Sequence, residues 1–173
     1  MKKTFMALTL ASLFMAGASQ AQDHSATVTV HCSIVGDHTE CTVYTAQSTV
    51  TLNGQLADLP IQGQNATAPT ALEYNIMPSE GGSCVGKVAI VLNGLADDAE
   101  GTTLANTDTS AGAAKGIGIG LFDSNYSPLT INSSQITTDT SIGQIYLQAV
   151  RLNTQVPVEG TLNGSLTLNI IRL

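Results

Sequence analysis

Apolar and polar residues follow one another along this chain in short runs that have the period of β-strands. After residue 21, no window keeps apolar residues at positions i, i+3, i+4 and i+7 over several helical turns. Runs rich in Val, Ile, Thr and Leu recur instead, and clusters of Gly, Asn, Asp, Ser and Pro separate them, which is typical of strands joined by turns. The pattern predicts strands at 26–35, 41–52, 71–77, 85–92, 115–122, 128–132, 142–152 and 161–171.

The number and spacing of these runs predict an all-β sandwich. About eight short strands in a chain of this length are typical of two packed sheets in a single domain. Residues 96–114 hold few large apolar side chains, so we expect a long loop there, with a short strand near Leu104.

The first residues have the pattern of an export signal. Two lysines precede an uncharged apolar run at 4–17, and Ser19 and Ala21 place small residues at the positions that a signal peptidase reads. The alternative is a membrane anchor, but a helix that spans a bilayer needs about 20 apolar residues. We therefore predict that 1–21 is a signal peptide and that Gln22 becomes the N-terminus.

Charge narrows the range of partners. Removal of the signal leaves residues 22–173, a length that suits one domain with its own core. Only four strong bases then remain, Lys87, Lys115, Arg151 and Arg172, against 13 Asp and Glu residues, so the net charge is −9. Nucleic acids and anionic membranes bind clustered Lys and Arg. The composition therefore argues against both partners and is typical of a protein that stays soluble outside the cell.

The two ends of the exported chain carry complementary strand patterns. Near the N-terminus, polar residues alternate with the apolar residues Ala26, Val28, Val30, Cys32 and Ile34. At the other end, the last predicted strand runs through 166–173 to the end of the sequence, so we expect one of its edges to be unpaired. A spare strand and an open apolar edge suggest that copies exchange strands. The alternative is that the N-terminal segment is an ordinary edge strand of its own sheet.

Three cysteines, Cys32, Cys41 and Cys84, belong to a protein that we expect in an oxidising compartment. One disulfide is therefore expected. Three pairings are possible and each leaves one thiol, and the spacing alone does not choose among them.

One cluster of candidate metal ligands occurs in the sequence. His31, Cys32, His38 and Cys41 place four nitrogen and sulfur donors within eleven residues, which could hold zinc. The spacing is not that of a standard zinc finger, and Cys41 has a better use in a disulfide. We therefore expect no metal site, with His31 on the polar side of a strand and His38 in a turn.

Patterns for nucleotide binding and catalysis are weak. The run Gly116-Ile-Gly-Ile-Gly120 lies inside one predicted strand, whereas a dinucleotide-binding loop needs a strand before its glycines and a helix after them. These glycines are expected to let a neighbouring strand or loop approach closely. No Gly-x-Ser-x-Gly sequence occurs, and Asp97, Asp98 and Glu100 are expected in a solvated loop. We predict a protein without enzymatic activity, cofactor or small-molecule substrate.

A set of segments along the exported chain carries a family resemblance through its order and spacing. The segments are Cys41-Thr-Val, Ser48-Thr-Val-Thr-Leu-Asn-Gly54, Tyr74-Asn-Ile76 before Cys84, Gly116-Ile-Gly-Ile-Gly-Leu-Phe-Asp123, Ser127-Pro-Leu129, Gln148-Ala149, and the ending from Gly160 to Leu173. Together they resemble the type 1 family of chaperone–usher fimbrial (pilin) subunits, over nearly all of the exported chain.

The resemblance implies an immunoglobulin-like β-sandwich that lacks its last strand and is completed by donor-strand exchange. A periplasmic chaperone would first lend a strand, and at an outer-membrane usher the N-terminal extension of another fimbrial subunit would replace it. Residues 22–36 would be that extension and 37–173 the pilin domain. The chain would be a structural subunit of a surface fimbria, in a homopolymer or heteropolymer that supports cell adhesion. The alternative is a single-domain tip adaptor or adhesin that binds a surface ligand.

The resemblance also assigns roles to particular residues. It pairs Cys41 with Cys84 and leaves Cys32 as a free thiol, whereas the rival pairing is a Cys32–Cys41 bridge around Gly36. The donor strand would present Ala26, Val28, Val30, Cys32 and Ile34. The C-terminal strand would face a chaperone or another subunit through Gly160, Leu166, Leu168 and Ile170. The family usually has an aromatic residue second from the end, where this chain has Arg172.

The signal pattern makes a direct prediction about the exported protein. Its chain should begin at Gln22 and lie outside the inner membrane, because the small residues at 19 and 21 define one cleavage position. Intact-mass measurement or N-terminal sequencing of the exported protein tests this. Cytoplasmic material that retains Met1 as its main form would contradict it.

Overall fold

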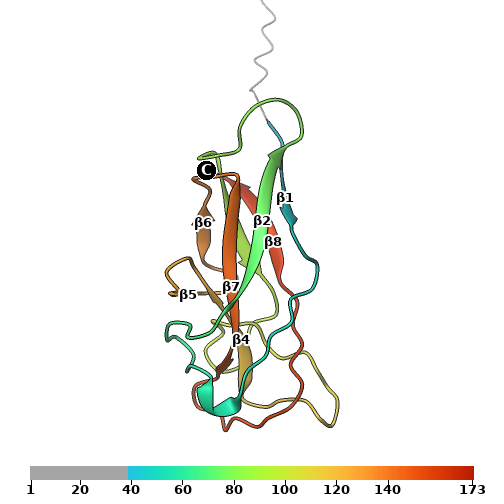
Figure 1. The fold of residues 1–173 in the computed structure, drawn as a ribbon, viewed down its shortest axis with the longest axis vertical. Coiled ribbons are helices and arrows are strands. Elements are labelled where there is room, and N and C mark those ends of the chain that lie inside the picture. The colour runs from blue at the N-terminus through green and yellow to red at the C-terminus, as the bar shows by residue number, and fades with distance from the viewer. Residues whose placement is uncertain (1–38) are drawn as a thin grey trace, which may run out of the picture. The chain divides into compact units, whose positions relative to one another are not determined.

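The computed structural model describes residues 39–173, and the predicted signal peptide, the N-terminal extension and the predicted strand at 26–35 lie outside the described residues. Figure 1 shows the arrangement of the strands. A 3-10 helix, η1, covers Leu56–Asp58. The strands are β1 Cys41–Thr45, β2 Thr70–Pro78, β3 Val88–Asn93, β4 Ile117–Phe122, β5 Pro128–Leu129, β6 Gln135–Thr137, β7 Ile142–Arg151 and β8 Thr167–Arg172.

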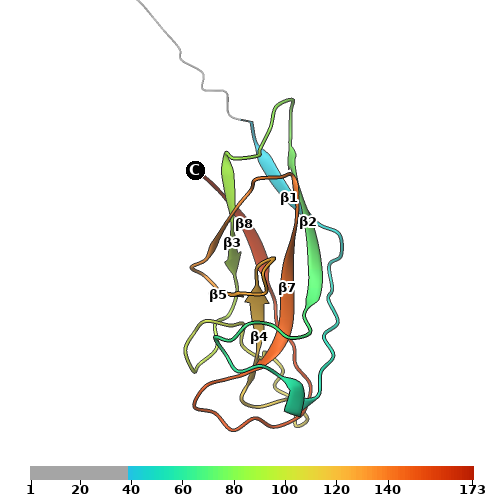
Figure 2. The same cartoon turned by 60° about the vertical axis from the view of Figure 1, so that its left-hand side comes forward.

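The strands form two sheets (Figures 1 and 2). The larger sheet has the order β1-β2-β7-β4-β5, and the smaller sheet has the order β6-β3-β8. All pairings between neighbouring strands are antiparallel. The prediction of an all-β fold with two sheets is therefore confirmed.

The main core lies between the two sheets, and the alternation of the sequence explains it. On β2, the buried side chains are Leu72, Tyr74 and Ile76, whereas Glu73 and Met77, which point to the other face, are exposed. Val88, Ile90 and Leu92 of β3 belong to the same apolar cluster. Each large side chain buried in this way contributes roughly 1.5–3 kcal/mol to the hydrophobic stabilisation of the fold.

Strand β4 is buried along its whole length, and its glycines make this possible. A Cβ atom at Gly118 would lie 2.5 Å from Thr103 Oγ1 and 3.0 Å from the carbonyl oxygen of Leu104, so only glycine lets this loop lie against the strand. Leu104 exchanges two 2.9 Å backbone hydrogen bonds with Ile119. The glycines therefore act as predicted, and Leu104 pairs with β4 through an isolated bridge rather than a strand of its own.

A disulfide joins Cys41 to Cys84, as the family resemblance implied. It links the start of β1 to the segment before β3 and so connects the two sheets. Because 43 residues separate the two cysteines, the closed loop stabilises the fold by about 4 kcal/mol in the chain-entropy model. Cys41 is thus not paired with Cys32, which lies outside the described residues.

Two predicted strands are much longer than the observed ones, and one observed strand was missed. The strand expected at 41–52 ends at Thr45, and the strand expected at 161–171 begins only at Thr167. In addition, β6 was not predicted. The apolar alternation continues through 46–52, but a strand also needs a hydrogen-bonded neighbour. The last backbone bond to β2 is that of the Ala46 N–H to Glu73, and residues 48–52 make none among the described residues.

The loop after β3 is folded around one buried carboxylate, that of Asp97. Its Oδ1 atom accepts hydrogen bonds from the backbone N–H groups of residues 99–101, and its Oδ2 atom accepts from the Thr103 N–H at 2.8 Å and from Gln62 Nε2 at 2.9 Å. The expectation of a solvated loop is therefore wrong for Asp97, which is only 6% exposed, although Asp98 and Glu100 are exposed.

These hydrogen bonds change the acidity of Asp97. Burial by itself would raise the pKa of the carboxyl, but the hydrogen bonds from Thr103, Glu100, Gly101 and Gln62 outweigh it and lower the pKa to about 2. The unfolded chain takes up this proton at higher pH than the folded chain does. The carboxylate therefore stabilises the fold above about pH 4, and this contribution is lost as the pH falls towards 2.

We predict that Asp97→Asn lowers the free energy of unfolding at pH 7 by about 2 kcal/mol, because the charged acceptor is lost from a buried network. The exposed Asp98→Asn is the control and should change the free energy by less than about 0.5 kcal/mol. Denaturant unfolding from pH 7 to pH 2 measures both. The gap between Asp97→Asn and the parent should narrow below pH 4, and a gap that does not depend on pH would contradict this assignment.

Candidate functional site

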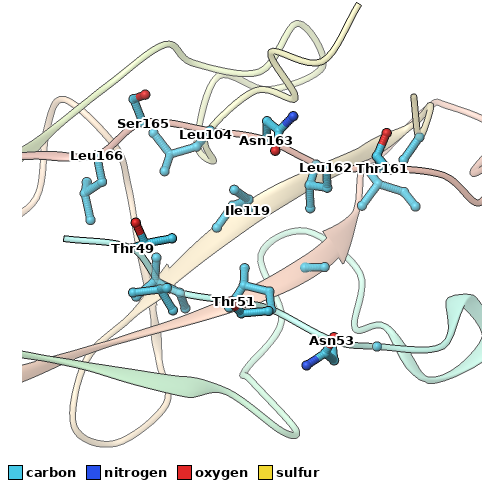
Figure 3. A pocket seen from close by; sticks show the side chains of 18 of the residues that line it. Thr49, Thr51, Asn53, Leu104, Ile119, Thr161, Leu162, Asn163, Ser165 and Leu166 are labelled. Carbon is cyan, nitrogen blue, oxygen red and sulfur yellow. The ribbon is translucent and has the colours of Figure 1, made fainter. Parts of the chain in front are cut away.

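An open groove of about 790 Å³ runs along the molecule between two extended segments. One wall is residues 45–54, which continue from the last residue of β1, and the other is residues 159–168, which lead into the start of β8. We call these the first wall and the second wall. Figure 3 shows Thr49, Thr51 and Asn53 along the first wall.

The surfaces that face the groove are largely apolar. Its floor contains Leu72, Leu104, Ile117, Ile119 and Leu147, which come from β2, β4, β7 and the loop before β4. The walls add side chains that are only half-buried although they pack against the main or second core cluster, namely Val50, Leu52, Leu162, Leu166 and Leu168. The core of the sandwich is thus partly open to solvent along this line.

The backbone edges that border the groove lack partners. None of the hydrogen bonds within the described chain involves residues 48–54. On the opposite side, β8 is the edge strand of its sheet and pairs only with β3. Two strand-like edges therefore face each other with their N–H and C=O groups available to a further strand.

The two walls run in opposite directions (Figure 3). The order from Thr49 to Asn53 along the first wall follows the same direction in space as the order from Leu166 to Thr161 along the second. A strand placed between them would be antiparallel to one wall and parallel to the other. The groove thus offers two different hydrogen-bonding edges, and the two orientations of an inserted strand are not equivalent.

Beyond the walls, the end of β8 is held to the segment that precedes β1. Arg172, near the end of β8, donates a 2.6 Å hydrogen bond from its guanidinium to the carbonyl oxygen of Thr39. The disulfide at Cys41 lies two residues further along the same segment. Arg172, which departs from the family pattern, therefore ties the end of the C-terminal strand to the segment before β1.

The second wall is anchored on the side away from the groove. Asn106 donates from Nδ2 to the carbonyl oxygens of Ala114 and Thr161, and its Oδ1 accepts from the N–H of Asn163. Thr161 also pairs with the loop through its own N–H, which donates to Gly112. Hydrogen bonds therefore hold the second wall to the neighbouring loop, whereas residues 48–54 of the first wall have no such bonds among the described residues.

The structure places only part of the predicted site. Gly160, Leu166 and Leu168 line the groove, while Ile170 lies further along β8 and packs half-buried against the core. The predicted donor-strand residues Ala26, Val28, Val30, Cys32 and Ile34 lie outside the described residues. Sequence reasoning missed the first wall as part of the site, although the alternation of Val50 and Leu52 marks it as a segment with one apolar face.

Residues 39–173 show no other arrangement of functional side chains that would compete with the groove. In this range, no three His, Cys, Asp or Glu side chains gather where they could hold a metal ion. The same residues contain no helix long and apolar enough to cross a membrane. A second cavity, near Phe122, has a volume of about 110 Å³.

The missing hydrogen bonds of the first wall make a prediction for hydrogen exchange in the monomeric protein. The amides of Val50 and Leu52 should exchange nearly as fast as those of an unfolded chain, because no internal bond protects them. The amides of Ile90 and Leu92 in the central strand β3 should exchange only on global unfolding. Protection of the first wall that equals that of β3 would mean that the groove is already filled.

Sequence comparisons show that the chain is similar to fimbrial proteins. No protein-family model matches the chain. The chain is 29% identical over 147 residues to the probable major fimbrial subunit LpfA of Escherichia coli O157:H7, with 85% of this chain and 82% of that protein covered. It is 38% identical over 61 residues to the long polar fimbria protein A of Salmonella typhimurium strain LT2, which covers 35% of this chain and 34% of that protein.

A solved structure has the same fold. The P pilus rod subunit PapA superimposes with a TM-score of 0.53 and 12% sequence identity, over 85% of this chain and 100% of that one. At this identity the likeness concerns the fold alone, which is a two-sheet antiparallel sandwich in both. The sequence similarity to a fimbrial subunit along most of both chains, together with this fold, confirms the resemblance found in the sequence: the chain is a fimbrial (pilin) subunit with an incomplete immunoglobulin-like sandwich.

Proposed function

We propose that the groove is an acceptor site for an extended strand of another chain and that the subunit polymerises by donor-strand exchange. The observation that carries this proposal is the apolar groove between two unpaired backbone edges. A strand can satisfy both edges at once and cover the apolar floor, which a globular partner or a small molecule cannot do. The role is structural and involves no chemical step.

The N-terminal extension of a second copy supplies a donor of suitable length and pattern. We assign residues 22–36 to this extension and 37–173 to the pilin domain. The alternating apolar positions of the extension run from 26 to 34, and the first wall of the groove runs from 45 to 54. Since strands advance about 3.3 Å per residue, the two segments have nearly equal lengths. Every second side chain of the donor then points at the floor.

Burial of the donor side chains accounts for a stable polymer. About five apolar side chains would enter the groove, and each large one contributes roughly 1.5–3 kcal/mol when fully buried. Ala26 and Cys32 are small, so the sum is on the order of 10 kcal/mol before the cost of ordering the donor. This term is similar to the whole stability of a typical domain. A subunit with an empty groove is therefore marginal, and a filled one is much more stable.

An open apolar groove also requires protection before assembly. We propose that a periplasmic chaperone fills it with a strand of its own after export, and that an outer-membrane usher brings about the exchange for the extension of the next subunit. The half-buried side chains of Leu166 and Leu168 and the free edge of β8 are the features that a chaperone strand would cover. The product is a fimbria at the cell surface that supports adhesion.

The donor side of the proposal predicts a contrast between neighbouring residues. Val28→Asp should abolish insertion into a second subunit, because a charge would be forced into an apolar groove. Thr27→Asp, on the opposite face of the same segment, should insert nearly as well as the parent. Each variant is mixed with a chaperone-bound subunit, and dimers that resist dissociation are measured on a gel. Normal dimer formation by Val28→Asp would exclude this segment as the donor strand.

The acceptor side predicts a matching contrast on β8. Leu168 lines the groove, whereas Thr167 beside it is exposed and points away. Leu168→Asp should lower the capture of a peptide of residues 22–36 by at least about tenfold, since a buried charge without a partner costs more than 1.4 kcal/mol. Thr167→Asp should capture the peptide normally. Near-ultraviolet circular dichroism shows whether each variant is folded, and a folded Leu168→Asp protein with full capture would refute the acceptor assignment.

A further inference from the structure

Both walls of the groove contain a chemically labile dipeptide. Asn-Gly pairs occur at 53–54, 93–94 and 163–164, and the first and third of these line the groove. In such a pair, the backbone nitrogen of glycine can attack the side-chain amide carbon of asparagine. The new N–C bond closes a succinimide ring, the side-chain nitrogen leaves as ammonia, and water then opens the ring at either carbonyl. The products are an aspartate and an isoaspartate.

The reaction depends on the backbone around the pair. Glycine offers the least hindered nitrogen and the widest range of backbone conformations, so the attacking geometry is reached most easily before glycine. A glycine N–H that is held in a hydrogen bond, or an asparagine that is held in a strand, must be released first. The hydrogen bonds of the three pairs therefore rank their reactivity.

The pair at 93–94 is locked. The N–H of Gly94 donates to Asn132 Oδ1 at 3.1 Å, so the attacking nitrogen is occupied. The Asn93 side chain donates to the same oxygen at 3.2 Å and accepts from Asn169 Nδ2 at 2.8 Å. Asn93 is also the last residue of β3, where it pairs with Thr167. Several bonds must open before this pair can react.

The pair at 53–54 is open. Both residues are exposed, and no hydrogen bond within the described chain involves residues 48–54. Among residues 39–173, the backbone nitrogen of Gly54 and the side-chain amide of Asn53 have no partner, and no strand pairing holds the dihedral angles of this segment. The pair at 163–164 is intermediate, because the backbone N–H and C=O of Asn163 bond to Asn106 and Thr107, while the N–H of Gly164 makes no bond in the described chain.

We propose that Asn53 is a deamidation site and that its modification sets the useful lifetime of an unfilled groove. Asn53 lies on the first wall, opposite the second wall that carries Asn163 (Figure 3). Either product adds a negative charge to a chain whose exported part is already strongly acidic. The isoaspartate also adds a methylene to the backbone, which displaces every N–H and C=O group beyond it relative to an inserted strand.

A strand seated in the groove protects Asn53, and this part of the inference depends on the proposed function. Pairing with the first wall orders residues 48–54 and engages their N–H groups, so the attacking conformation becomes rare. Asn53 therefore deamidates more slowly in subunits whose groove holds a strand than in subunits whose groove is empty. The damage accumulates in subunits that remain without a donor strand and lowers their ability to accept one.

The first experiment measures the reaction itself. The monomeric exported chain is incubated at mildly alkaline pH, and peptide mapping by mass spectrometry follows the replacement of NH2 by OH at each pair. Deamidation should be fastest at Asn53, slower at Asn163 and at least about tenfold slower at Asn93, since each bond that must open contributes up to roughly tenfold. Equal rates at Asn53 and Asn93, or no reaction at Asn53, would overturn the proposal.

The second experiment separates this inference from the proposed function. The same incubation is repeated with a peptide of residues 22–36, and thermal unfolding shows whether the peptide binds. A raised midpoint together with at least about tenfold slower reaction at Asn53 supports protection by a seated strand. A raised midpoint with unchanged reaction would overturn the protection. If the midpoint does not change, the proposed donor strand fails, while the ranking of the three pairs still decides the deamidation site.

The matched variant is Asn53→Gln, which keeps an amide at this position but removes the favourable ring closure. Aged parent protein should capture the peptide of residues 22–36 more weakly than fresh protein, whereas aged Asn53→Gln should lose little. The same loss in both proteins would show that deamidation at this position does not limit the acceptor groove.

Discussion

Backbone hydrogen bonding is the constraint on which this structure depends. Every buried N–H and C=O group of a sandwich needs a partner, and strands obtain their partners from neighbouring strands. Here residues 48–54 of the first wall have no such neighbour among the described residues, and β8 has only one. The side chains beneath these edges are apolar, so water satisfies the backbone but not the floor of the groove. The groove thus follows from the unpaired edges that border it.

Because the core is partly open along the groove, contacts outside the groove must stabilise the fold. The disulfide links the two sheets and lowers the conformational entropy of the unfolded chain. The Asp97 carboxylate accepts the hydrogen bonds that organise the loop lying against β4. Arg172 holds the end of β8 to the segment before β1. These contacts all lie outside the groove. The sandwich can therefore keep its walls in position while the groove itself remains accessible to a strand.

The sequence pattern predicted the strands that are paired on both sides and was less successful where pairing fails. The alternation in β2 and the apolar run in β7 were sufficient, because core burial and strand pairing agree there. The first wall has the same alternation, and only the tertiary structure shows that it lacks a neighbour. The burial of Asp97 was not predictable, because its six backbone and side-chain donors come together only when the loop folds.

The sequence also predicted only part of the groove, because it shows which residues are apolar and not which segments lie next to one another. Leu166 and Leu168 were assigned from the family resemblance and do line the groove, whereas the pairing of Cys41 with Cys84 could not be chosen from spacing. The role of Arg172 was also hidden, since its partner is a backbone carbonyl that no residue pattern identifies. Sequence patterns report which face of a segment is apolar, and they do not report what lies beside it.

The direction of the two walls has a mechanical consequence. They run along the length of the groove, so a strand of the kind proposed above would lie along both walls, and a pull on its end would act along its own axis. Such a load acts in shear on all of the hydrogen bonds to both walls together, instead of opening them one after another. Rupture under force is governed by the rate of escape over a barrier rather than by equilibrium stability. A joint of this geometry would bear tension well even where each of its contacts is weak.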